Sequence, residues 1–191
     1  RPTRFYPLHS ASLRDASRNR VGLNCSMPQS FSMSDGQKIA TRASTEIEAW
    51  LREWDGTVSV ENVEYEAAYQ EKDIDLLWMT ATRDYSIEIK ADRNDGTGNF
   101  FFETISNKEK NTLGCFLKTQ ADFLFYYFVE PRTLYILPMP RTRKWFAENI
   151  NRFEEREAAT PVGKDHYITV GRIVPIDIVL KEVSGVKVKQ L

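Results

Sequence analysis

"YSIEIKADRNDGTGNFFFE", residues 85–103, decides the fold prediction. Its first half alternates apolar and charged residues, which is typical of a β-strand that turns one face toward a core. The two isoleucines share one face, so Glu88 and Lys90 share the other. A turn signal follows, and three phenylalanines then lead to another acid, Glu103. The stretch therefore predicts two extended segments with charged residues grouped beside an aromatic-rich core.

The preceding segment, DIDLLWM (73–79), predicts a strand that a short polar connection joins to the first one. In such a hairpin Asp75 would lie near Glu88, with Lys90 beside them. Two carboxylates with backbone or water oxygens suit a hard divalent ion such as Mg²⁺, and a lysine next to them can stabilise charge building on a phosphoryl oxygen. The same residues would also make an ordinary solvated sheet face with cross-strand ion pairs. The dense aromatic surroundings favour a partly buried site for phosphodiester hydrolysis.

The rest of the chain predicts an α/β protein. In chain order we expect a helix over 32–54, strands over 57–69, 99–105 and 122–129, a hairpin partner over 132–138, a helix over 141–153 and one or two late strands within 166–183. The apolar run 122–129 hardly alternates, which indicates a strand covered on both faces. Pro175 indicates an edge or a bend. This order predicts a central mixed β-sheet flanked by helices.

Composition and charge narrow the class of protein. With 191 residues, 41% hydrophobic and 28% charged, the chain is long enough for one globular domain with a small arm. A net charge of −1 excludes a globally basic nucleic-acid binder. Residues 1–30 carry five arginines against one acid, so we expect a largely irregular basic arm, either a solvated tail or a phosphate contact. No apolar run is long enough to cross a bilayer, and we expect a cytoplasmic protein without a membrane partner.

Four stretches together match a known pattern. They are "IDLLW" (74–78), "IEIKAD" (87–92), "TGNFFFE" (97–103) and "GCFLKTQADFLFYYF" (114–128). Over roughly residues 40–150 the chain resembles the PD-(D/E)XK nuclease superfamily, and within it the small nucleases of phages and mobile elements. The resemblance implies a restriction-endonuclease-like core within a single domain over 31–191. If the gene is a phage gene, the cytoplasm would be that of the host cell.

The resemblance also implies roles for individual residues. Asp75 and Glu88 would be metal ligands and Lys90 the catalytic lysine. The additional acid on the first helix would be Glu46, or less favourably Glu48. The proline that names the motif is absent before Asp75, where Asp73-Ile74 stands, so Asp73 is a rival ligand. Glu103 would either help to bind a second metal ion and position DNA, or form a structural salt bridge.

We therefore expect a Mg²⁺- or Mn²⁺-dependent DNA endonuclease that leaves a 5′-phosphate, as the resemblance implies. The alternative is a non-catalytic module that keeps the fold and binds nucleic acid or protein. Cations are needed to hold the DNA backbone over an acidic metal site. The candidates are Arg93, Lys108, Lys110, Arg141, Arg143 and Lys144, together with the arginines of the arm. A homodimer or a partner protein is a further expectation, by analogy with nucleases that cut both strands.

Overall fold

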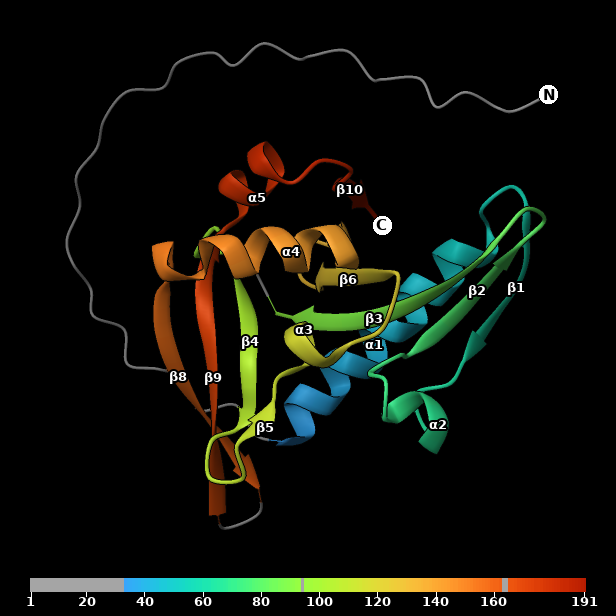
Figure 1. Cartoon of the computed structure of the whole chain (residues 1–191). Coiled ribbons are helices and arrows are strands. Elements are labelled where there is room, and N and C mark those ends of the chain that lie inside the picture. Colours follow the sequence, from blue (N-terminus) through green and yellow to red (C-terminus); the bar gives the residue numbers. More distant parts are fainter. Residues whose placement is uncertain (1–32, 94, 163–164) are drawn as a thin grey trace. The chain divides into compact units, whose positions relative to one another are not determined.

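Strand β3 (Asp84–Asp92), which carries Glu88 and Lys90, lies in a six-stranded sheet. The computed structural model describes residues 33–93, 95–162 and 165–191 (Figure 1), so the predicted basic arm lies outside the described residues. The sheet order is β1-β2-β3-β6-β7-β10. Its other strands are β1 (Thr57–Asn62), β2 (Leu76–Thr80), β6 (Phe123–Phe128), β7 (Thr133–Pro138) and β10 (Lys187–Gln190). Strand β3 is parallel to β6 while the other pairs are antiparallel, so the predicted mixed sheet is confirmed.

A second sheet and the helices complete the described fold. The second sheet has the order β5-β4-β9-β8, with β5 (Thr112–Leu113), β4 (Asn99–Asn107), β9 (Asp165–Pro175) and β8 (Glu154–Val162). The helices are α1 (Met33–Arg52), α2 (Ala67–Gln70), α3 (Cys115–Lys118), α4 (Met139–Asn149) and α5 (Ile176–Glu182), and a 3₁₀ turn covers Ile150–Arg152. No helix within the described residues combines the length and the apolar character that crossing a membrane requires.

The six-stranded sheet is covered on both faces, which explains the apolar run of β6. Phe125 and Tyr127 pack with α1 in one core. Leu124, Tyr126 and Phe128 point the other way, into a core formed with α4, α5, β4 and β9. Because both faces of β6 are buried, every second residue need not be polar. The predicted doubly covered strand is confirmed.

Two segments differ from the sequence prediction. The strand predicted over 57–69 ends at Asn62, whose side-chain oxygen accepts a hydrogen bond from the backbone N–H of Glu64 at 3.2 Å and turns the chain. The late segment 166–183 is not all strand, because α5 begins directly after Pro175. Its Ile176, Val179 and Val183 are buried at helical spacing. Strands β8 and β10, and the separation into two sheets, were not predicted.

Candidate active site

A pocket lies where β2 and β3 part. Strand β2 pairs with β3 only as far as Leu76 opposite Ile87, and the second half of β3 continues beside β6 alone. The open edge of β3, the start of α1 and the turn after β1 enclose a space of about 390 Å³. Its lining residues are Gly36, Ala40, Ser44, Glu64, Asp75, Glu88, Ile89, Lys90 and Ala91. The structure thus brings the three central residues predicted from the sequence into one pocket.

Asp75 is held at this edge by backbone hydrogen bonds. Its N–H donates to the Ile87 carbonyl at 2.9 Å, and its Oδ2 accepts from the Ile89 N–H at 2.7 Å. Burial is the main cause that raises the pKa of Asp75 to about 6. The charges of Glu64 and Asp73 add to this rise, while the hydrogen bond from the Ile89 N–H and a side-chain hydrogen bond with Glu88 oppose it. The backbone hydrogen bonds therefore hold the Asp75 carboxyl group at a poorly solvated position in the pocket.

Glu88 is the more buried acid of the pair. Only 8% of the residue is exposed, and within the described part of the chain no hydrogen-bond partner reaches its Oε2 atom. Burial and the neighbouring Asp75 and Asp73 raise the pKa of Glu88 well above its usual range, although Lys90 and Lys118 act in the opposite direction. Two adjacent buried carboxyls of this kind require a shared proton or a cation.

These acids fit a hard divalent cation, with help from other oxygens. Asp75 and Glu88 supply two carboxylates, and the uncompensated Oε2 of Glu88 is the kind of atom that a cation satisfies. Among the described residues, no three His, Cys, Asp or Glu side chains form a group that would hold an ion alone. Backbone and water oxygens would therefore complete the coordination, as Mg²⁺ commonly requires.

Lys90 lines the pocket next to the two acids. Its Nζ lies 3.8 Å from the Oε2 of Glu103, and 31% of its side chain is exposed. Burial acts to lower the pKa of Lys90, but Cys115 and the carboxylates of Glu103 and Asp92 outweigh it, so the pKa is raised. The side chain therefore carries a positive charge at neutral pH. Glu103 does not line the pocket but reaches it through this ion pair.

Neither helix acid lines the pocket, although Glu48 accepts a hydrogen bond of 3.3 Å from the hydroxyl of Ser44, which does. Glu46 accepts a hydrogen bond from the Tyr127 hydroxyl and another from Arg42 Nε at 2.8 Å. Glu48 pairs with Arg52 at 2.6 Å and accepts from the Asn62 amide at 2.9 Å. The face of α1 that does border the pocket carries Gly36, Ala40 and Ser44. The structure therefore does not bring the predicted helix acid to Asp75 and Glu88.

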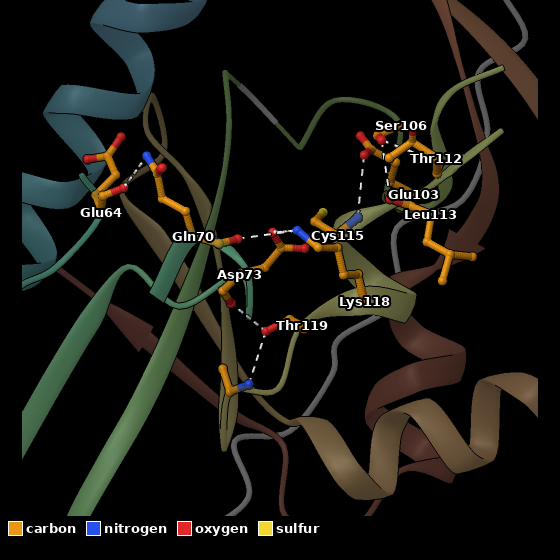
Figure 2. Close-up of polar contacts among 11 residues, drawn as sticks. Glu64, Gln70, Asp73, Glu103, Ser106, Thr112, Leu113, Cys115, Lys118 and Thr119 are labelled. Carbon is orange, nitrogen blue, oxygen red and sulfur yellow. Dashed lines mark hydrogen bonds and ion pairs between the residues drawn. The ribbon is translucent and has the colours of Figure 1, made fainter. Parts of the chain in front are cut away.

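Asp73, the rival ligand, is engaged by another lysine. Lys118 Nζ donates to Asp73 Oδ1 at 2.7 Å and to the Gln70 carbonyl at 3.2 Å, as Figure 2 shows. The Thr119 hydroxyl donates to the Asp73 carbonyl at 2.6 Å. These contacts join the loop before β2 to the segment around α3. Asp73 thus stands beside the pocket without lining it.

Glu64 is the pocket acid that the sequence did not reveal. It follows the turn at Asn62, and a hydrogen bond of 2.8 Å from the Val63 N–H to the Asp75 carbonyl fixes this turn beside the site. The Gln70 side chain donates to the Glu64 carbonyl at 3.0 Å (Figure 2). Because residues 57–69 were predicted to form one strand, Glu64 was not recognised as a candidate site residue. Asn62, a residue that favours turns through its side chain, was the available signal.

Most of the predicted DNA-binding cations make contacts within the protein. Arg93 lies 3.8 Å from Glu130, Lys108 pairs with Glu157, and Arg141 Nη1 donates to the Ser184 carbonyl at 2.8 Å. Arg143 is half-buried and donates to the carbonyls of Phe116 and Thr119. Lys110 and Lys144 are exposed. Of the six, Arg93 is nearest in sequence to the pocket, two residues after Ala91.

Comparison of the chain with protein-family models, with curated proteins and with solved structures finds no match. The resemblance to the PD-(D/E)XK nucleases therefore rests on the stretches quoted above. The functional argument rests on the geometry and the charges of the pocket.

Proposed function

We propose that the chain is a metal-dependent DNA endonuclease of the PD-(D/E)XK type, in which Asp75 and Glu88 hold Mg²⁺ or Mn²⁺. One observation carries the proposal: a buried carboxylate oxygen of Glu88 has no hydrogen-bond partner within the described residues, beside a second carboxyl. Ionising two adjacent buried carboxyls is costly, and this cost is the reason why the pKa values of both are raised in the absence of a cation. A divalent cation between the two acids would compensate this cost, and Lys90 at the same pocket fits chemistry on a phosphate.

The chain's own residues have distinct parts in this chemistry. A bound divalent ion supplies a Lewis acid that polarises a phosphoryl oxygen and lowers the pKa of water. Asp75 and Glu88 would hold that ion at the pocket. The ammonium group of Lys90 stabilises the negative charge that builds on the phosphoryl oxygens. Glu64, half-buried at the pocket wall, orders the attacking water.

The bond changes follow from the family resemblance. The oxygen of water forms a bond to phosphorus while the bond from phosphorus to the 3′ oxygen breaks. The products are a 5′-phosphate and a 3′-hydroxyl: the attacking water loses a proton to solvent, and the departing 3′ oxygen takes up a proton from solvent. The order of α1, β1, β2 and β3, followed by β6 parallel to β3, supports the restriction-endonuclease-like core as part of the proposal. Such an enzyme would meet its DNA in the cytoplasm.

The test is cleavage of a substrate panel with Mg²⁺, with Mn²⁺ and with EDTA. The panel contains supercoiled, linear, branched and single-stranded DNA, and RNA. The wild type is compared with Asp75→Ala and Lys90→Ala, and with Glu157→Gln, which changes an exposed acid of the second sheet. We expect metal-dependent cleavage of DNA by the wild type and by Glu157→Gln, and loss of cleavage in the other two. Absence of cleavage on every substrate would favour the non-catalytic binding module instead.

A further inference from the structure

We propose that Glu103 is a positioning residue through which the second sheet holds Lys90 at the pocket. The inference rests on the proposed function of that pocket. Of the two roles expected from the sequence, it departs from the second-metal ligand and develops the salt bridge into a part in the reaction. Its basis is the ion pair of 3.8 Å between Lys90 Nζ and Glu103 Oε2, which joins the two sheets beside the acids.

Lys90 points to the face of the six-stranded sheet on which β4 lies. Lys90 is paired in register with Tyr126, and Tyr126 belongs to the core that includes Phe100 and Phe102 of β4. The backbone N–H of Phe101 donates to the Tyr126 hydroxyl at 3.2 Å. Strand β4 is therefore fixed against β6, the strand that pairs with β3 at Lys90. This packing places Glu103 of β4 next to the lysine.

Glu103 is itself held from its other side. Its Oε1 accepts a hydrogen bond of 3.4 Å from the Cys115 N–H at the start of α3, as Figure 2 shows. Gly114 makes this approach possible, because a Cβ added there would lie 2.5 Å from the Glu103 carbonyl oxygen and 2.8 Å from its Cγ. Only 14% of the Glu103 side chain is exposed. A carboxylate fixed in this way leaves its second oxygen facing Lys90.

If Glu103 positions Lys90, its loss should slow the chemical step of the proposed reaction. A lysine side chain has many rotamers, and an anchored partner reduces the number that Lys90 samples. Glu103 does not line the pocket, so its removal leaves Asp75 and Glu88 in place for the metal ion. Loss of positioning alone lowers kcat and leaves metal binding and KM unchanged.

The kinetic test is a double-mutant cycle with Glu103→Gln and Lys90→Gln, measured with saturating Mg²⁺. Glu103→Gln keeps the shape of the side chain and removes its charge. We expect it to lower kcat by about 10-fold, with KM and the Mn²⁺ dissociation constant within about 2-fold of wild type. The double variant should be no slower than Lys90→Gln, because coupled residues are not additive. Glu103→Asp should recover part of the rate, and Glu157→Gln should match wild type. Additive effects, or a loss of Mn²⁺ affinity in Glu103→Gln, would overturn the inference.

A second measurement follows Lys90 without cleavage. In protein labelled with ¹³C at the lysine Cε, the Lys90 signal is assigned by its absence in Lys90→Gln. We expect that signal to shift in Glu103→Gln and to stay in place in Glu157→Gln. An unchanged signal in Glu103→Gln overturns the inference even if the enzyme cuts DNA. A shifted signal in a protein that cuts nothing rejects the proposed function and leaves the positioning intact.

Discussion

At the scale of single residues, the pocket is defined by a carboxylate that the protein does not satisfy. Glu88 is buried, its Oε2 has no hydrogen-bond partner within the described residues, and Asp75 lies beside it. Buried polar atoms are nearly always paired in folded proteins. This exception in a pocket is the basis of the proposed cation site.

The first prediction concerns the replacement of this acid. In EDTA at about pH 8, Glu88→Gln should raise the free energy of unfolding by about 1 kcal/mol or more, because it removes an acid whose ionised form is disfavoured in the folded protein relative to the unfolded chain. The variant should also lose the rise in melting temperature that Mn²⁺ gives the wild type. Thermal unfolding with and without Mn²⁺ measures both effects. Glu157→Gln, at an exposed position, should behave like wild type. A strongly destabilised Glu88→Gln protein would mean that the acid has a structural role.

The second prediction is a dependence of stability on pH. The folded-state pKa of Asp75 is raised from 3.8 to about 6, and that of Glu88 is raised further above 4.5. The native protein therefore binds more protons than the unfolded chain from about pH 4 upward, and its stability falls as the pH rises.

Melting temperatures in EDTA between about pH 5 and pH 8 measure this slope. The double variant Asp75→Asn/Glu88→Gln should show a flatter profile than wild type. Mg²⁺ should stabilise the wild type more at the high end of the range, because it competes with protons for the same oxygens. Identical slopes in the two proteins would contradict the pKa assignment.

At the scale of elements, the sequence predicted strands correctly where buried and exposed residues alternate regularly. Alternation over residues 84–91 predicted β3, and the hairpin with β2 places Asp75 at the pocket with Glu88. The end of the pairing between β2 and β3 at the Leu76–Ile87 pair was not predictable, because no local sequence pattern shows where strand pairing stops. Likewise, IDIVLKE alternates as a strand does, yet it forms α5 because the partners of its buried residues come from distant segments.

The helix acid shows a further limit of sequence reasoning. A resemblance places an acid on the first helix, but the side of the helix that meets the site depends on how α1 rotates against the sheet. Ala43, Ile47 and Leu51 are fully buried and set that rotation. Glu46 is thereby turned toward Tyr127 and away from the pocket. Glu64, from a turn that was read as strand, occupies the pocket wall.

The third prediction concerns the close approach of α3 to β4. Gly114→Ala should destabilise the protein by about 1–3 kcal/mol, because the added Cβ meets backbone atoms of Glu103. Gly36→Ala is the matched control, since nothing lies within 4 Å of a Cβ added there and alanine favours a helix. Urea unfolding measures both free energies. Equal stability of Gly114→Ala and wild type would show that the contact is easily relaxed.

At the scale of the whole molecule, the charge balance would set how the proposed DNA substrate is held. The net charge is −1, and four of the six cations proposed for DNA contact interact with groups of the protein itself. The described part of the chain would therefore release few counterions on association with DNA, and the arginines of residues 1–30 would be the remaining source. Recognition would depend on the metal ion and on a small number of phosphates near the pocket.

The fourth prediction follows from this balance. The measured quantity is the association constant of the Lys90→Ala protein for a short DNA duplex in the presence of Ca²⁺. The logarithm of this constant should fall linearly with the logarithm of the salt concentration, with a slope of about −2 to −4. Fluorescence anisotropy across a salt series measures the slope. A slope of about −8 or steeper would show a much larger cationic surface and would contradict the account of the charges.

The most direct test of the central claim is a calorimetric titration of Mn²⁺ into the wild type and into Glu88→Gln and Glu157→Gln. We expect saturable binding by the wild type and by Glu157→Gln, and loss of binding in Glu88→Gln, whose circular dichroism spectrum should remain that of the folded protein. Equal binding by all three proteins, or no binding by the wild type, would contradict the assignment of Asp75 and Glu88 as the metal site.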